Sequence, residues 1–396
     1  MSRIPAPMPS AMAPQHRSPL RILYVVSEDW YFLSHRLPMA RAAQKAGFEV
    51  HVATRVVDGA AAIAAEGFKL HPIPFARGRI AILSALQTVF ALRGILRAVN
   101  PAIVHQVALQ AAILGSIASI GRRTPLVNAL TGFGFTFISG GMKARLLRPL
   151  IVFLLRSLCT RNGNVALVQN SDDRAALISA GVAADRIVII PGSGVDVEDL
   201  QPLPEPPGVP TVAFVGRLLE DKGIRTLVAA VQLLHSRGKS VHLLVAGTTD
   251  PANPASIADS DVATWARQPG IQFLGHVKDI ASVWRQAHIA VLPSRREGLP
   301  KALLEAAACG RPMIATDVPG CREVVRPGET GLLVPLDDVT ALADAISSLA
   351  EAPDLRRRYG AAARRFAVEK FSAEAIGEQT VRLYRTVINP DNGRRD

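Results

Sequence analysis

Short runs of apolar, often β-branched residues alternate with stretches of helical periodicity along most of the chain. This alternation is typical of parallel β-strands joined by crossover helices. In the first half, the pattern predicts strands at Arg21–Val26, Glu49–Thr54, Leu70–Pro74, Ala102–His105, Leu126–Ala129, Val165–Gln169 and Ile187–Ile190. In the second half, it predicts strands at Val212–Gly216, His242–Ala246, Ile271–Leu274, Ile289–Leu292, Met313–Ala315 and Leu332–Val334. We therefore expect an α/β protein with two Rossmann-like, doubly wound parallel-sheet domains in tandem.

A proline-rich segment divides this pattern into two parts. The sequence QPLPEPPGVP, residues 201–210, has five prolines in ten residues. Proline removes a backbone donor and stiffens the chain, so this segment is predicted to be a linker and not part of a sheet. We expect a disordered tail at 1–19, a first domain at 20–200 and a second domain at 211–374. Amphipathic helices are expected at Phe32–Ala46, Ile224–His235 and Val339–Leu349.

Composition narrows the class of protein. Of the 396 residues, 49% are hydrophobic and 20% are charged, which excludes disorder for most of the chain. Three cysteines, Cys159, Cys309 and Cys321, form no CxxC pair and argue against a disulfide scaffold or a thiolate zinc site. The first residues lack the apolar core of a signal sequence, and no run of 18 apolar residues occurs. A soluble, cytoplasmic protein is expected.

The net charge of +12 is spread unevenly. Residues 1–200 carry 21 Lys and Arg against 11 Asp and Glu, and no acidic residue stands between Glu66 and Asp172. A field of one sign attracts polyanions, meaning nucleic acid, anionic lipid or a diphosphate-bearing substrate. Apolar stretches lie between these basic residues, and this favours a membrane surface over nucleic acid. A basic, solvated face without a partner is the alternative.

Two common phosphate-binding motifs are missing at the strand–helix junctions. Neither a GxGxxG fingerprint nor a GxxxxGK[ST] loop occurs, so a nicotinamide or flavin dehydrogenase and a P-loop NTPase are both disfavoured. Doubly wound sheets nevertheless bind ligands outside the carboxyl ends of their strands. Residues that directly follow strands are therefore the candidates for chemistry.

The segment SRREGLPKALLEAAACGRP, residues 294–312, follows one such strand. A helix is expected to open near Leu299 with Pro300 in its first turn, and its N-terminus suits a bound phosphate. Glu297 would stand before the helix and Glu305 two turns into it, where one carboxylate could reach a polyol and the other a ribose. The alternative is that Glu297 caps the helix and Glu305 is a solvated helical residue.

A second segment, FVGRLLEDKG at residues 214–223, follows the first strand of the second half. It places two cations, Arg217 and Lys222, where they suit a pyrophosphate leaving group, because stabilising the developing negative charge accelerates such transfers. The alternative is a solvated loop.

Together these segments resemble the donor site of retaining glycosyltransferases of family 4. Glu297 and Glu305 match the Glu-x7-Glu signature, and residues 216–223 are similar to the G-R-x4-K-G segment. Further matches are at residues 273–279, 330–335 and 191–196. The resemblance implies the GT-B fold, in which two domains face each other across a cleft, and a last helix, residues 375–390, that packs back on the first domain. It also implies transfer with retained anomeric configuration, and neither a metal nor another cofactor.

The resemblance also implies roles for particular residues. Glu297 would contact the donor sugar, Glu305 the ribose, and the cations Arg217 and Lys222 the diphosphate. The expected donor-binding residues are Gly216, Arg217, Lys222, Val277, Glu297, Gly298, Leu299, Pro300 and Glu305. Asp259 and Asp261 have the spacing of metal ligands but lie in an expected polar loop, so we expect no metal there.

The first domain departs from the commonest pattern of the family. Residues 27–36, SEDWYFLSHR, stand where many members have a Gly-Gly loop, and Thr131-Gly132 stands where many have His-Gly. These departures resemble the branch that extends polyprenyl-diphosphate-linked sugars in O-antigen, capsule or exopolysaccharide synthesis. His35 and His105 remain as candidate catalytic residues that could shuttle a proton near neutral pH, with structural hydrogen bonding as the alternative. His35, Arg36, Thr131 and Gly132 are expected to bind the acceptor.

Residues 143–161 combine basic residues with a strongly apolar face, as interfacial helices do. Membrane contact is expected at Lys143, Arg145, Arg148 and Arg156, and residues 79–97 are similar in kind. The alternative is an ordinary packed helix with solvated arginines.

The expected function is that of a retaining glycosyltransferase, peripheral on the inner face of the plasma membrane. It would use a nucleotide sugar, with UDP favoured and GDP possible, and a polyprenyl-diphosphate-linked acceptor. The rival enzyme class is a nucleotide-sugar epimerase of the same fold. A nucleic-acid-binding protein ranks third because it gives no reason for the positions of Glu297 and Glu305, so no nucleic-acid partner is expected.

Overall fold

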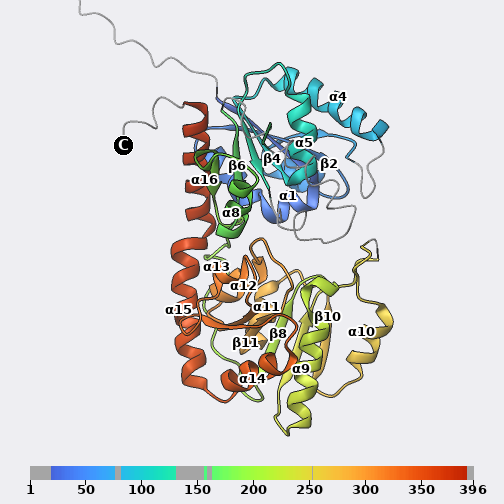
Figure 1. The fold of residues 1–396 in the computed structure, drawn as a ribbon, viewed down its shortest axis with the longest axis vertical. Coiled ribbons are helices and arrows are strands. Elements are labelled where there is room, and N and C mark those ends of the chain that lie inside the picture. The colour runs from blue at the N-terminus through green and yellow to red at the C-terminus, as the bar shows by residue number, and fades with distance from the viewer. Residues whose placement is uncertain (1–18, 76–81, 131–155, 158–162, 252, 390–396) are drawn as a thin grey trace, which may run out of the picture.

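The computed structural model describes residues 19–75, 82–130, 156–157, 163–251 and 253–389. Figure 1 shows two α/β domains stacked along the long axis. Helices α15 (Pro353–Phe371) and α16 (Ala373–Ile388) run along one side of them. The expectation of two parallel-sheet, Rossmann-like domains is confirmed.

The first sheet has seven parallel strands in the described part of the chain, in the order β3-β2-β1-β4-β5-β6-β7. Its strands are β1 (Arg21–Glu28), β2 (Glu49–Arg55), β3 (Lys69–Pro72), β4 (Ile103–Val107), β5 (Leu126–Ala129), β6 (Val165–Val168) and β7 (Ile187–Ile189). The helices between them are α1 (Asp29–His35), α2 (Leu37–Lys45), α3 (Ala60–Ala65), α4 (Ile82–Val99), α5 (Ala108–Ala118) and α8 (Ser171–Ser179). Strand order reverses beside β1, which pairs with β2 on one side and β4 on the other.

The second sheet has six parallel strands among the described residues, in the order β10-β9-β8-β11-β12-β13. Its strands are β8 (Thr211–Val215), β9 (His242–Ala246), β10 (Ile271–Gly275), β11 (Ile289–Leu292), β12 (Met313–Thr316) and β13 (Gly331–Val334). Its helices are α9 (Ile224–Ser236), α10 (Asp259–Ala266), α11 (Ile280–Gln286), α12 (Lys301–Ala308), α13 (Cys321–Val324) and α14 (Val339–Ala350). Every strand expected from the sequence is present within two residues of its expected bounds.

One expected helix is wrong. The pattern over residues 32–46 predicted a single helix, whereas the chain forms α1 and α2 with a break at Arg36, where φ is −127° and ψ is −12°. Pro38 causes the break because proline lacks a backbone N–H and fits only the first turn of a helix, and here it stands in the first turn of α2.

The last helix returns to the first domain. Helix α16 packs along α2, and Gly377 permits this contact because a Cβ there would lie 2.6 Å from the Cβ of Ala42. Tyr384 of α16 enters the core, where its hydroxyl lies 2.5 Å from Nδ1 of His105 and 2.9 Å from the hydroxyl of Tyr24. The final helix is thus part of the first domain's core.

The chain passes between the domains twice, and the two passages are hydrogen-bonded to each other. The Val195 N–H donates to the Phe371 carbonyl at 2.8 Å, and the Ala373 N–H donates to the Val195 carbonyl at 2.8 Å. Gly194 has φ +77°, and a Cβ there would lie 2.7 Å from the Cα of Ala373. Glycine is therefore required for the two crossings to pair.

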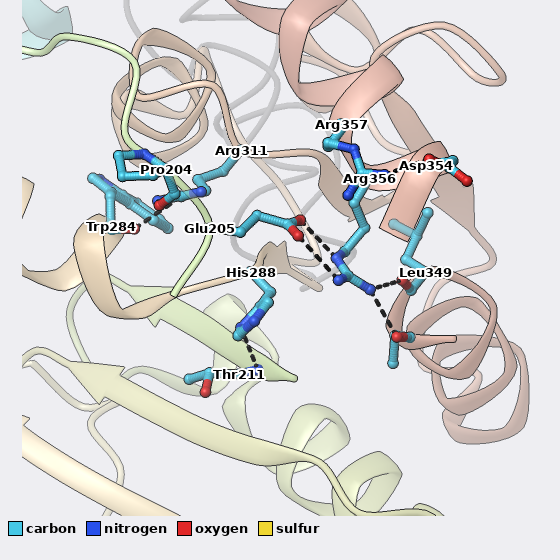
Figure 2. A network of polar contacts seen from close by, with 11 residues as sticks. Pro204, Glu205, Thr211, Trp284, His288, Arg311, Leu349, Asp354, Arg356 and Arg357 are labelled. Atoms are coloured by element: carbon cyan, nitrogen blue, oxygen red, sulfur yellow. Dashed lines mark hydrogen bonds and ion pairs between the residues drawn. The ribbon is translucent and has the colours of Figure 1, made fainter. Parts of the chain in front are cut away.

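Arginines fasten the proline-rich segment to the second domain (Figure 2). Arg356 makes a two-pronged ion pair with Glu205 at 2.7 and 3.1 Å and donates to the carbonyls of Leu349 and Ala350. Arg311 donates to the Pro204 carbonyl at 2.8 Å. The segment is outside both sheets, as expected, but these contacts hold it on the second domain at several points.

Replacing Arg356 with leucine tests this fastening. The side chain is buried, so its loss should cost about 2–4 kcal/mol of the free energy of unfolding. Arg357→Leu is the matched control, because the Arg357–Asp354 pair is exposed and contributes little. We expect the melting temperature to fall by several degrees for Arg356→Leu only; equal falls in both variants would contradict the assignment.

Candidate active site

The candidate site begins at the loop that follows β11. This loop runs from Pro293 to Pro300, and α12 starts at Lys301, two residues later than the sequence suggested, with Pro300 at its N-cap. Gly320 from the neighbouring strand-end loop packs against it, because a Cβ on Gly320 would lie 2.7 Å from the Glu297 carbonyl oxygen. The loop is therefore fixed by close backbone packing.

Glu297 and Lys222 form the centre of the site. The Lys222 ammonium donates to the Glu297 carboxylate at 2.6 Å, and the Ser294 hydroxyl donates to the same oxygen at 2.7 Å. Two loops from different strands meet here because Gly223, with φ +71°, lies so close to Pro293 that a Cβ would stand 1.9 Å from its carbonyl oxygen. Sequence reasoning placed both charges after strand ends but missed their direct contact and Ser294.

Arg217, like Lys222, follows strand β8, but it pairs with a different residue. Its guanidinium donates to the Asp250 carboxylate at 3.1 Å, and its side chain is about half exposed. The loops that carry the two residues are packed together, since a Cβ on Gly247 would lie 1.8 Å from the Gly216 carbonyl oxygen. Asp250, which sequence reasoning missed, thus holds the cation expected to bind diphosphate.

Glu305 is not a solvated helical residue, so that alternative is wrong. Its side chain is largely buried, and burial raises its pKa, while Lys301, 3.6 Å away, opposes the shift. Lys301 also donates to the Ser34 carbonyl of α1 at 3.3 Å. This lysine was missed although it lies four residues before Glu305 on the same helical face.

The first domain touches the loop that carries Glu297. Asn170, directly after β6, donates through its side chain to the Gly298 carbonyl at 2.9 Å. Gly192 comes so close to Leu299 that a Cβ there would lie 2.6 Å from its Cδ2. The site therefore lies where the two domains meet, and the rule that ligands bind at strand ends could have identified Asn170.

His35, at the end of α1, lies near Lys222 and Lys301 of the candidate site. Burial and the nearby cations Arg36, Lys301 and Lys222 lower its pKa to about 3. Its ring stacks on Tyr31 with the centroids 4.3 Å apart, and its Nδ1 has no hydrogen-bond partner among the described residues. The imidazole is neutral at physiological pH. The low pKa argues against the proton shuttle expected near neutral pH, and the catalytic role of His35 stays a prediction, since a neutral ring can still accept or donate a hydrogen bond.

His105 is removed from the catalytic candidates. The structure continues β4 to Val107, so His105 lies inside the strand, fully buried and bonded to Tyr384. Burial lowers its pKa well below the usual range. A side chain without exposed surface cannot touch a substrate, so we assign His105 a structural role in anchoring α16.

Arg36, an expected acceptor-binding residue, is also buried. One guanidinium nitrogen donates to the His35 carbonyl at 3.2 Å, while Nε and Nη2 have no partner among the described residues. Its charge acts on its neighbours, since it contributes to the lowered pKa of both His35 and His105.

The remaining expected residues are placed as follows. Val277 follows β10 and is partly buried against the core of the second domain. Arg156 is exposed and its guanidinium lies beside Gly181. The other expected acceptor and membrane residues lie outside the described residues, namely Thr131, Gly132, Lys143, Arg145 and Arg148.

The expected loop around Asp259 and Asp261 is wrong, because both residues stand in the first turn of α10. Asp261 pairs with Arg225, and Asp259 accepts a hydrogen bond from Thr249. The expectation that no metal is bound stays a prediction.

Comparisons with known proteins identify the family of this chain. Residues 21–161 match the family model described as "Glycosyl transferase 4-like", and residues 209–352 match "Glycosyl transferases group 1". The capsular polysaccharide biosynthesis glycosyltransferase CapM of Staphylococcus aureus is 25% identical over 380 residues, which cover 91% of this chain and 97% of the relative. A Campylobacter jejuni relative, N,N'-diacetylbacillosaminyl-diphospho-undecaprenol alpha-1,3-N-acetylgalactosaminyltransferase, is 24% identical over 90% of this chain and 98% of its own length.

Solved structures show the same fold. Sucrose-phosphate synthase from Thermosynechococcus elongatus superposes with a TM-score of 0.79 at 22% identity, over 94% of this chain and all of that one. HepE from Anabaena, in complex with UDP and glucose, superposes with a TM-score of 0.74 at 18% identity, over 93% of this chain and all of that one. Fold and site together define a glycosyltransferase with the GT-B fold. The chain belongs to the group 1, family 4-like glycosyltransferases, and the epimerase alternative has no support.

The low pKa of His35 predicts a particular pH dependence. Between about pH 6.5 and pH 3 the unfolded chain binds a proton that the folded protein does not, so this group lowers stability as pH falls through that window. Removing the imidazole in His35→Gln should make the acid loss of stability shallower, by at most about 1.4 kcal/mol per pH unit.

Urea unfolding of the wild type and the variant between pH 4 and pH 7 measures this difference. His242→Gln, which removes an exposed histidine, is the control and should follow the wild type. Parallel curves for the wild type and His35→Gln would contradict the lowered pKa, because they would mean that the imidazole binds its proton equally well in the folded and unfolded chains.

Proposed function

We propose that this chain transfers a sugar, with retention of configuration, from a nucleoside-diphosphate donor to a polyprenyl-diphosphate-linked glycan in bacterial polysaccharide synthesis. The observation that carries the proposal is the contact of Glu297 with Lys222 and Ser294 at the ends of β8 and β11, where the first domain closes over the loop. An acidic group for sugar hydroxyls and a cation for diphosphate thus stand side by side. No metal or other cofactor enters the proposal.

The mechanism follows from these positions. The donor's diphosphate would lie against Lys222 and draw Arg217 away from Asp250, while Glu297 orients the sugar hydroxyls and Glu305 the ribose. The acceptor hydroxyl attacks C1 from the face that the leaving group departs from. The C1–O bond to the phosphate breaks, the new C1–O bond forms, and the acceptor proton passes to the leaving phosphate oxygen. The two cations stabilise the charge that develops on that oxygen.

The acceptor class is supported by relatives that span nearly the whole chain. The name of one gives capsular polysaccharide biosynthesis, and the name of another gives a diphospho-undecaprenol acceptor. A lipid diphosphate also suits a first domain without an acidic residue between Glu66 and Asp172. We propose that the enzyme works as a peripheral protein on the inner face of the plasma membrane, and that UDP is the favoured nucleotide, as in the HepE complex.

Alanine at Glu297 tests the central role. Removing the carboxylate should lower the rate of sugar transfer by about a hundredfold or more while the fold persists. Radiolabel transfer to a polyprenyl-diphosphate acceptor measures the rate, and a thermal melt checks the fold. Glu329→Ala, which removes an exposed carboxylate of the same domain, is the control. Normal turnover in Glu297→Ala would refute the role.

A thermal-shift screen with UDP, GDP, ADP, dTDP and CMP tests the donor site. A nucleotide at 100 times its dissociation constant adds about 2.7 kcal/mol to stability, so one nucleotide should raise the melting temperature by several degrees. The shift should shrink in both Arg217→Ala and Lys222→Ala, which remove the cations proposed to hold the diphosphate. A shift that survives both substitutions would place the diphosphate elsewhere.

A further inference from the structure

Helix α4 carries large apolar side chains on the face that points away from the domain. Ile82, Leu83, Leu86 and Phe90 are 82%, 69%, 49% and 70% exposed. Surface helices usually direct such residues inward. Helix α4 already has an inward face, formed by Thr88, Leu92, Leu96 and Val99. The exposed apolar residues are therefore additional to those that the fold buries.

The same exposed face becomes basic toward the end of the helix. Residues 83, 86, 90, 93 and 97 are spaced three or four apart, so Arg93 and Arg97 continue the stripe that Leu83, Leu86 and Phe90 begin. Arg122, after the neighbouring helix α5, donates to the side chain of Asn100 just beyond α4 and adds a cation at this end. The sequence around them has no acidic residue between Glu66 and Asp172. We refer to Ile82, Leu83, Leu86, Phe90, Arg93 and Arg97 as the α4 face.

Length and composition alone would let α4 cross a bilayer. Within the described residues, α4 is the one helix that is long and apolar enough for this, with 18 residues and a mean hydropathy of 1.5. However, α4 is the crossover between β3 and β4, and its inner face packs on α5 and the sheet. Spanning the membrane would remove Leu92 and Leu96 from the core. The helix can lie along a membrane surface without any such loss.

We propose that the α4 face is the surface by which this enzyme docks on an anionic lipid bilayer. The apolar side chains would enter the boundary between headgroups and acyl chains, and the arginines would meet anionic headgroups. Figure 1 places α4 at the end of the first domain farthest from the second domain. The bilayer would thus contact the first domain while the second domain, with Lys222 and Glu297, stays clear of it.

This inference rests on the lipid-linked acceptor proposed above and names the surface that brings the enzyme to it. A bilayer is favoured over a second copy of the chain because the face is basic as well as apolar. Two identical basic faces would repel each other, whereas an anionic surface attracts them.

The test is flotation of the full-length chain with vesicles of phosphatidylcholine, with and without phosphatidylglycerol. The wild type should float with the anionic vesicles, and less so at about 0.5 M salt, where surface charges are screened. The variant L83S/L86S/F90S should bind at least about tenfold less at either salt concentration. The variant R93Q/R97Q should lose about fivefold per cation, on anionic vesicles only.

The matched control is I178S/V368S, which removes two exposed apolar side chains from α8 and α15. It should bind as the wild type does, and melting temperatures should be unchanged in all three variants. Full binding by L83S/L86S/F90S, or an equal loss in the control, would overturn the proposal. So would light scattering that shows a wild-type dimer, a monomeric L83S/L86S/F90S and equal vesicle binding by both, since the face would then cover a second copy.

A transfer assay with a short-chain acceptor in detergent separates this inference from the proposed function. The three variants should transfer sugar there at the wild-type rate and lose activity only with acceptor embedded in vesicles. A wild type that floats but transfers sugar to no lipid-linked acceptor would contradict the proposed function and leave the docking surface standing. A wild type that transfers sugar in detergent but never floats would overturn the docking surface alone.

Discussion

The close approach of Gly223 to Pro293 is the contact on which the candidate active site depends. A side chain at Gly223 would collide with the Pro293 carbonyl, so the loops after β8 and β11 can touch only with glycine there. That contact brings Lys222 within hydrogen-bonding distance of Glu297. The charges could not be moved apart by a few ångström without separating the loops, so the spacing between the Lys222 ammonium and the Glu297 carboxylate is fixed by backbone packing.

The chain is held on each domain close to the places where it passes between them. Arg311 and Arg356 hold the proline-rich segment on the second domain, and α16 is held in the first domain by Tyr384. Between these anchors the chain crosses at Val195 and Ser372, whose neighbourhoods share backbone hydrogen bonds. Any rotation of one domain against the other would therefore change dihedral angles near these paired crossings. The segment that looks most like a hinge in the sequence is one of the better fastened parts.

The fold could be predicted from the sequence because each buried strand of a parallel sheet leaves a continuous apolar run. The candidate donor site could be proposed for a similar reason, since ligand-binding residues follow strand ends and the resemblance to family 4 was dense there. The contacts within the site could not be found this way. Whether Arg217 points to Asp250, or Lys222 to Glu297, depends on how loops from separate strands pack, which no local pattern records.

The environments of His35 and His105 could not be predicted from local sequence patterns either. His105 looked like a strand-end residue, but β4 is two residues longer than its pattern suggested, and its partner Tyr384 lies 279 residues away. The unusual pKa of His35 arises from burial and from cations of both domains. A residue's environment in this fold is supplied by distant segments, so candidate catalytic residues in the first domain could not be ranked from sequence.

The position of Tyr384 has a consequence for how the protein is made. The core of the first domain contains Ile376, Leu383 and Tyr384 of the last helix, packed with Tyr24 and Phe48 near the start. During synthesis, the strands of the first domain leave the ribosome long before α16 is made, and until then an apolar surface stays uncovered along α2. The second domain, whose strands and helices lie within one continuous stretch, has no such delay. The part made first is thus the last to be completed, and the synthesis of α16 is the event that allows the first domain to finish folding.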